Sequence, residues 1–209
     1  MNLEDLIEAC KRNEELAWKL LYEQYSTQMR AVCFRYLGNH SDAEDLLQDC
    51  FIKIFTNIDR FKGTGSFEGW IRSIFVNSSL KFLRKKKSET LSLGSEALDK
   101  WDRDNMVSPL QTEESEKMKD LIQQTLFTKE ELLDMLQQLP DGYRVVFNLY
   151  EIEEYSHKQI AKALSISINT SKTQLNRARK YLQQLLYRSS LKQKKEMENE
   201  EYRELLKIV

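Results

Sequence analysis

Residues 156–179 read SHKQIAKALSISINTSKTQLNRAR, and this stretch predicts two helices joined by a tight turn. Ser156, followed three residues later by Gln159, forms a capping box that predicts the start of the first helix. Ser165 lies in the turn, Ile166 fills the angle between the helices, and Ser167 can cap the second helix. The outer face of the second helix carries polar and basic side chains, namely Lys172, Thr173, Asn176, Arg177 and Lys180. This pattern is typical of a helix-turn-helix that reads the DNA major groove, although an ordinary helical hairpin with a solvated basic face would share it.

The composition of the chain favours long helices. Its 209 residues include only 6 Gly and 2 Pro, and no alternating pattern typical of strands is visible. Hydrophobic residues make up 41% and charged residues 31%, as in a soluble globular protein. We therefore predict an all-α fold of two small helical domains.

Charge is segregated along the sequence. The net charge of −1 excludes a uniformly basic nucleic-acid binder. Residues 89–128 hold nine acidic and four basic side chains, and helical periodicity is lost there. We predict a flexible acidic linker with a transient helix near residues 113–126. A basic cluster precedes this linker, formed by Lys81, Arg84, Lys85, Lys86 and Lys87.

Apolar residues at helical spacing divide the rest of the chain into helices and domains. In the N-terminal half, Leu3 and Leu20 are among the residues predicted to be buried. Ser41 and Glu44 form a second predicted capping box, and Ser66 is predicted to cap a further helix. The predicted domains are 10–88 and 129–187, joined by the linker 89–128 and followed by a charged tail, 188–209, that can prolong the last helix.

The helix after Ser41 carries a candidate protein-docking face. Asp45, Gln48 and Asp49 fall on one side at spacings of three and four residues. A solvated face explains such a pattern at least as well. However, Ile52 and Phe55 interrupt it with apolar side chains that we expect to be exposed, which favours a protein partner.

The segment from Phe61 to the basic cluster is a candidate site for single-stranded DNA. The loop 62–66 has small residues and little reason to be buried, whereas Phe67 and Trp70 at helical spacing favour core packing over base stacking. Asn77, whose amide both donates and accepts, could read a flipped base while neighbouring basic side chains track phosphates.

Catalysis, metals and cofactors receive little support from the sequence. Its 2 His, His40 and His157, have no partners at metal-ligand spacing, and no Gly-rich phosphate loop is present. We therefore expect neither an enzyme nor a bound cofactor. The three cysteines, Cys10, Cys33 and Cys50, are predicted to be buried reduced thiols. An acidic N-terminus and the lack of long apolar runs predict a cytoplasmic protein.

Three motifs in this order resemble the extracytoplasmic-function (ECF) sigma factors of the sigma-70 family. They are residues 42–51, DAEDLLQDCF; residues 61–77, FKGTGSFEGWIRSIFVN; and the segment 139–179 that contains the helix-turn-helix. The resemblance implies that 10–88 is similar to sigma region 2 and 129–187 to sigma region 4. It also implies core RNA polymerase and promoter DNA as partners, with an anti-sigma factor possible and no small-molecule substrate.

The resemblance assigns three sets of site residues. Binding to core polymerase, through its β′ clamp helices and β flap, is expected to involve Asp42, Asp45, Gln48, Asp49 and Ile52. Recognition of the −10 element is expected to involve Lys62, Thr64, Ser66, Asn77, Lys81, Arg84 and Lys85. Recognition of the −35 element is expected to involve Ser156, Lys158, Thr170, Lys172, Thr173, Asn176, Arg177 and Lys180.

The chain departs from the family pattern within the helix-turn-helix. Ser165 stands where the family often has Gly in the turn, and Ser171 stands where an apolar residue is common. Lys172 and Gln174 stand where Arg is common. The resemblance therefore does not fix the −35 sequence that this chain reads.

A stand-alone regulator that binds DNA as a dimer through residues 129–187 is the rival prediction. Residues 10–88 would then be a sensor or interaction domain. The motifs at 42–51 and 61–77 speak against it, because a sensor domain has no reason to carry them. Gel filtration separates the two, since a regulator that reads palindromes is expected to be a dimer.

Overall fold

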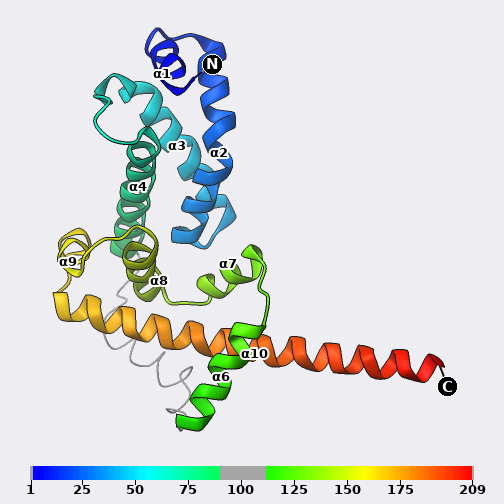
Figure 1. The fold of residues 1–209 in the computed structure, drawn as a ribbon. Coiled ribbons are helices and arrows are strands. Elements are labelled where there is room, and N and C mark those ends of the chain that lie inside the picture. The colour runs from blue at the N-terminus through cyan, green and yellow to red at the C-terminus, as the bar shows by residue number, and fades with distance from the viewer. Residues whose placement is uncertain (1, 90–111, 209) are drawn as a thin grey trace. The chain divides into compact units, whose positions relative to one another are not determined.

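The structure is a computed structural model that describes residues 2–89 and 112–208, and every regular element in those two ranges is a helix (Figure 1). The all-α prediction is therefore confirmed. The chain divides into two compact units, Met1–Ser92 and Leu93–Val209. Each unit has its own apolar core, and each is described by itself below.

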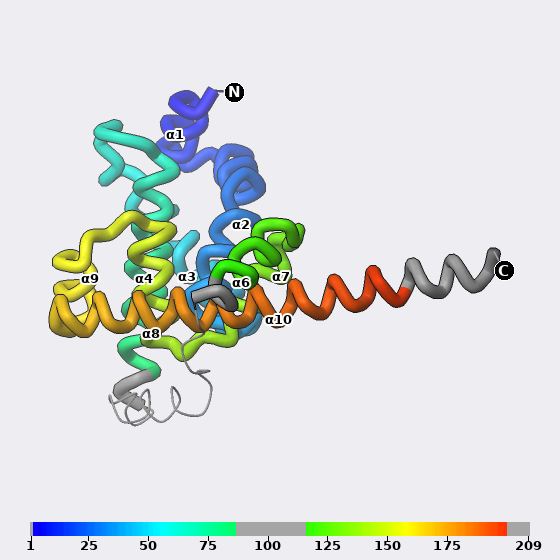
Figure 2. The backbone as a smooth tube through the Cα atoms, turned by 60° about the horizontal axis from the view of Figure 1, so that its bottom comes forward, coloured from blue at the N-terminus to red at the C-terminus, as the bar shows by residue number. Residues whose placement is uncertain are grey.

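The first unit is a bundle of three long helices with a short helix beside them. Its elements are α1 (Leu3–Lys11), α2 (Glu15–Leu37), α3 (His40–Asn57), the 3₁₀ turn η1 (Ile58–Arg60) and α4 (Phe67–Glu89). Helices α2, α3 and α4 pack against one another, and α1 packs on α2 (Figure 2). The packed faces meet in a fully buried core that includes Leu21, Met29, Leu47, Ile54 and Phe75.

Two leucines of this unit are more exposed than predicted. Leu3 is exposed because it is the first residue of α1, where only one side of the helix meets α2. Leu20 is exposed because its neighbour Leu21 takes the inward position, and successive residues of a helix point about 100° apart. The helices themselves lie where the spacing predicts.

The start of α3 differs from the predicted capping box. Gly38 ends α2 in the left-handed conformation at φ 67°, which glycine adopts without strain. Asn39 is then the N-cap, and its side-chain oxygen accepts a hydrogen bond from the Asp42 N–H at 3.0 Å. The prediction of Ser41 as the cap was wrong, because the chain is already helical at His40.

The second unit is built around one long helix. Its elements are α6 (Thr112–Gln124), α7 (Lys129–Gln137), α8 (Asp141–Phe147), the π-helical turn η2 (Asn148–Ile152), α9 (His157–Leu164) and α10 (Ile168–Ile208). Helices α6, α7, α8 and α9 all pack on α10 (Figure 1). Their core contains Met135, Leu139, Tyr143, Ala178, Tyr181 and Leu185.

The acidic linker and the C-terminal tail both contribute to this unit. Residues 90–111 of the predicted linker lie outside the described residues, but its later part forms α6, whose Met118 is buried. The tail prolongs α10 as predicted, and Ser190 within it is buried. From residue 194 to 199 every side chain is exposed, and Figure 2 shows α10 running on past the other helices of its unit. No helix in 2–89 or 112–208 combines the length and apolar character needed to cross a membrane.

Candidate protein and nucleic-acid interfaces

Helix α3 presents an acidic face opposite its buried face. We define the acidic face as Asp45, Gln48, Asp49 and Ile52, all of them exposed. Ile52 keeps 58% of its surface accessible, which is high for an isoleucine. The apolar positions between these residues point into the core, so the helix fixes which side faces outward. Among the described side chains, no cation forms an ion pair with Asp45 or Asp49.

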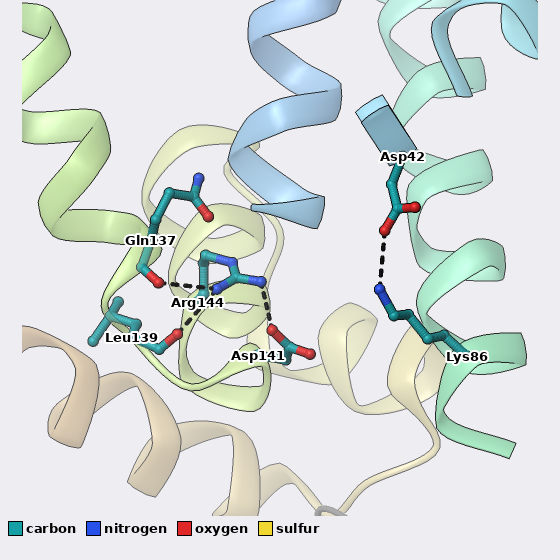
Figure 3. Close-up of polar contacts among 6 residues, drawn as sticks. All are labelled: Asp42, Lys86, Gln137, Leu139, Asp141 and Arg144. Carbon is teal, nitrogen blue, oxygen red and sulfur yellow. Dashed lines mark hydrogen bonds and ion pairs between the residues drawn. The ribbon is translucent and has the colours of Figure 1, made fainter. Parts of the chain in front are cut away.

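Asp42 and Phe55 depart from this arrangement. Asp42 lies one turn earlier, and its carboxylate accepts a hydrogen bond from Lys86 Nζ at 2.9 Å (Figure 3). That ion pair links the start of α3 to the basic end of α4. Phe55 was expected to be exposed but is half-buried, since its ring packs 4.6 Å from the ring of Trp18 on α2.

The loop between η1 and α4 is exposed, and aromatic side chains that flank it in the sequence pack against one another. Every residue from 62 to 66 is exposed, including the predicted site residues Lys62, Thr64 and Ser66. The Ser66 hydroxyl accepts a hydrogen bond from the Gly69 N–H at 3.3 Å, which confirms it as the cap of α4. Phe61 anchors the loop, because its ring lies 5.0 Å from Phe67 and 5.6 Å from Trp70. Phe67 is buried, as predicted.

A polar strip runs from this loop along α4. Its residues Asn77, Lys81, Arg84 and Lys85 are all exposed. The three basic residues follow Asn77 by four, seven and eight positions. That spacing places them on one side of the helix. The strip combines an amide with three cations, a combination suited to a nucleic-acid strand.

The helix-turn-helix forms as predicted. Ser156 and Gln159 make the capping box of α9, and Ser165 adopts the left-handed conformation of the turn at φ 55°. The Ser167 hydroxyl accepts from the Thr170 N–H at 2.9 Å and so caps α10. The predicted −35 residues that prove to be exposed are Ser156, Lys158, Thr170, Lys172, Thr173, Asn176 and Lys180.

Arg177 is the exception on the recognition helix. It was placed among the outward donors, but its side chain is half-buried and donates to the Tyr143 hydroxyl oxygen at 3.2 Å. Tyr143 is fully buried in α8. The contact therefore ties the recognition helix to the core of its unit.

A polar cluster around His157 joins three elements and was not predicted. His157 Nδ1 lies 2.9 Å from the hydroxyl oxygen of Ser171 on α10. The His157 ring stacks on Tyr150 of η2 at 4.6 Å, and the Arg179 guanidinium lies over the same tyrosine ring at 5.6 Å. Arg179 also pairs with Glu151 at 2.6 Å. Burial, followed by the positive charges of Lys172 and Arg179, lowers the pKa of His157.

Arg144 is a second residue that sequence reasoning missed. It is 4% exposed, and its guanidinium donates to the carbonyl oxygens of Gln137 and Leu139 and to the Asp141 carboxylate (Figure 3). These bonds satisfy groups at the end of α7 and hold the turn into α8. The only sequence signal was an acid and a base three residues apart, at positions 141 and 144.

The three cysteines are buried, as predicted, and carry no disulfide. Burial raises the pKa of Cys10 to about 11 and also raises the pKa values of Cys33 and Cys50. Thiols with raised pKa values stay protonated and unreactive at neutral pH.

Comparisons with known proteins agree across most of the chain. The family model for Sigma-70 region 2 matches residues 21–89, and the model for Sigma-70, region 4 matches residues 129–182. The ECF RNA polymerase sigma factor SigW of Bacillus subtilis is 30% identical in an alignment of 192 residues that covers 89% of this chain and 97% of that protein. The RNA polymerase sigma-H factor of Pseudomonas aeruginosa is 24% identical, over 88% of this chain and 93% of its own length.

The comparison with solved structures includes the sigma factor RpoE in complex with the anti-sigma factor NepR from Bartonella quintana. Its sequence identity is 22% and its TM-score is 0.47, with 80% of this chain and 95% of that chain covered.

Proposed function

This chain belongs to the extracytoplasmic-function sigma factors of the sigma-70 family, and from that premise we propose which of its surfaces contact RNA polymerase and which contact promoter DNA. As a sigma factor it binds core RNA polymerase and directs the initiation of transcription at promoters. We infer that it acts in the cytoplasm, that it adds no catalytic activity of its own, and that the polymerase performs the chemistry.

We propose that the acidic face of α3 docks on the β′ clamp helices of core polymerase. The observation that carries this assignment is the exposure of Asp45, Gln48, Asp49 and Ile52 on one side of a helix whose other side is buried. A protein interface needs an apolar contact surrounded by polar groups, and Ile52 beside the two carboxylates provides that combination. Asp42 acts at the edge of this face, where its pair with Lys86 aligns α3 with α4.

The loop 62–66 and the polar strip of α4 are proposed to bind the −10 element. Lys62, Thr64 and Ser66 would contact bases splayed from the duplex, and Asn77 would read a base edge. Lys81, Arg84 and Lys85 continue along the strip and would follow the phosphates of the strand. The exposure of all seven side chains supports this assignment.

The helix-turn-helix of α9 and α10 is proposed to bind the −35 element. Lys172, Thr173, Asn176 and Lys180 are exposed on the recognition helix, where a major groove would meet them. Ser156, Lys158 and Thr170 lie at the starts of the two helices, where phosphate contacts are common. We assign Arg177 a supporting role through Tyr143, and we propose domain limits of 10–88 and 129–187.

An anti-sigma factor is a further proposed partner. The matched sigma factor RpoE is one that was solved in complex with an anti-sigma factor, NepR. A protein that covered the acidic face or the DNA-binding faces of this chain would keep it from polymerase or promoter.

Charge reversal on the acidic face tests the docking assignment. We expect Asp49→Lys to weaken binding to core polymerase by on the order of several kcal/mol if the partner surface is basic there, because like charges would then face each other. Affinity for purified core polymerase is measured by fluorescence anisotropy of the labelled full chain.

The matched control is Glu23→Lys, which makes the same charge change at an exposed position of α2 outside the acidic face. We expect that variant to bind core with wild-type affinity, and both variants to keep the wild-type helical circular dichroism. Equal affinity of Asp49→Lys and the wild type for core polymerase would show that this face of α3 is not part of the polymerase interface.

A further inference from the structure

We propose that His157 is a positioning residue for the recognition helix, acting through its hydrogen bond to Ser171. The inference rests on the proposed reading of the −35 element by α10. It assigns to His157 a role that differs from direct DNA contact, because its Nδ1 atom points to a residue of the same unit.

The first step is the burial of Ser171. It lies in the first turns of α10, immediately before the exposed residues Lys172 and Thr173, and it is fully buried. A buried hydroxyl without a partner destabilises the fold. His157 Nδ1 at 2.9 Å provides that partner. A serine hydroxyl in a helix can also donate to the carbonyl four residues back, as Ser79 does to Phe75, but the Ser171 hydroxyl bonds to His157 instead.

The second step is the support of His157 itself. His157 is the first residue of α9. Its ring stacks on the ring of Tyr150, with 4.6 Å between the centroids and an interplanar angle of 26°. Arg179 lies over Tyr150 and pairs with Glu151, so the far side of the cluster is also tied to α10. The imidazole is therefore held in one orientation by groups from η2 and α10.

The third step connects this contact to recognition. A hydrogen bond between the first residue of α9 and the buried face of α10 fixes how the two helices of the motif cross. Lys172, Thr173 and Asn176 are carried on the exposed face of the same turns of α10. A small change in the crossing of the helices would displace all three from the bases that they read.

The hydroxyl of Ser171 accounts for why the motif needs such a residue. An apolar side chain at this buried position would need no hydrogen-bond partner. This chain has a hydroxyl there, and His157 supplies the group that satisfies it. Apolar residues should therefore be tolerated when they replace both His157 and Ser171, but less well when they replace only one of them.

Four variants of the full chain test that pairing. His157→Phe keeps a ring on Tyr150 but removes the partner of Ser171, and Ser171→Val removes the hydroxyl. The double variant replaces both polar groups by apolar ones, a change that can be nearly neutral. His157→Asn is the conservative variant, because its amide can occupy the place of Nδ1.

The first readout is amide hydrogen exchange over residues 168–176 in the free protein. We expect exchange in His157→Phe to rise about tenfold relative to wild type, and the double variant and His157→Asn to return to within about threefold. Ser171→Val should be milder than His157→Phe, because the half-buried His157 can turn to water. Unchanged exchange in His157→Phe, or no recovery in the double variant, would overturn the inference.

The second readout is open-complex formation by the holoenzyme on a promoter that the wild-type protein selects, compared with promoters altered at single −35 positions. We expect His157→Phe to lower occupancy and to flatten the preference among −35 sequences, with recovery in the double variant. Core binding should stay at the wild-type level.

A wild-type holoenzyme without −35 preference would refute the proposed function, whereas a −35 preference that His157→Phe leaves unchanged would refute only the positioning role. If His157→Phe does not fold, Ser171→Val and the double variant give the same comparison. The amide protection and the −35 preference of the double variant must then equal or exceed those of Ser171→Val.

Discussion

Asn176 and Arg177 are neighbours on the recognition helix, but their side chains have different surroundings. Asn176 is exposed, whereas Arg177 is half-buried and donates to the hydroxyl of the buried Tyr143. An exposed amide is free to make a bidentate contact with a base, a contact that contributes about 1–3 kcal/mol of discrimination. A guanidinium held against the core contributes mainly to the position of the helix.

Replacing each of these residues by Ala separates the two roles. We expect Asn176→Ala to change the ranking of −35 sequences, because one base loses its partner. We expect Arg177→Ala to weaken all −35 sequences alike and to lower the stability of the second unit. Transcription by the holoenzyme from a set of single-base −35 variants measures both effects. A change in ranking caused by Arg177→Ala, with stability unaltered, would return Arg177 to the base-reading set.

His157 makes the stability of the helix-turn-helix depend on pH. Burial lowers its pKa below the ordinary value of 6.5, and the facing cations Lys172 and Arg179 act in the same direction. Glu151 also faces the cluster, but its carboxylate is paired with Arg179. The unfolded chain therefore takes up a proton at a higher pH than the folded one. The contribution of His157 to stability is complete above about pH 6.5 and is lost as the pH falls through the lower pKa of the folded state.

We expect protection of the amides in α9 and the first turns of α10 to fall between pH 7.5 and pH 5, after correction for the intrinsic exchange rate. The fall should be smaller in His157→Asn, which cannot take up the proton. His40, the other histidine, is present in both proteins and cancels in the comparison. Equal pH profiles for the two proteins would mean that His157 is not the titrating group.

At the scale of the elements, α3 depends on Asn39 for its start. Its side chain accepts from the Asp42 N–H, and so satisfies one of the free donors of the first turn. Asn39→Ala should destabilise the first unit by about 1 kcal/mol. Ser41→Ala should have little effect, because Ser41 lies within α3 rather than at its cap and its side chain is exposed. Thermal unfolding followed by tryptophan fluorescence, in a Trp101→Phe background, reports on this unit through Trp18 and Trp70. A larger loss for Ser41→Ala than for Asn39→Ala would contradict the observed cap.

Sequence patterns predicted the helices well where periodicity or capping chemistry is strong. The capping box at Ser156 and the left-handed turn at Ser165 follow from local rules, and both are present. The cap of α3 was missed because Asn39 and Ser41 are both good caps, and only the path of the chain after Gly38 selects between them. Contacts between distant residues have no local signal. Arg177 with Tyr143 and His157 with Ser171 therefore came only from the structure.

At the scale of the whole molecule, we propose that both units take part in promoter recognition. The region 2 match lies in the first unit and the region 4 match in the second. Each interface by itself is expected to bind DNA weakly. Attachment to one polymerase raises the effective concentration of each domain at its promoter element, so the pair selects a promoter that neither would hold alone. The matched regions also argue against the rival regulator, which would have no use for a region 2.

The most direct test of this account is transcription in vitro with purified core RNA polymerase on a library of genomic fragments. Reactions contain no added factor, the wild-type chain or the Asp49→Lys variant, and the transcript starts are sequenced. We predict discrete starts that appear only with the wild-type chain and share a −10 and a −35 element, and we predict that Asp49→Lys reduces them strongly. Starts that do not depend on the folded chain, although it binds core polymerase, would contradict its role as a promoter-selecting sigma factor.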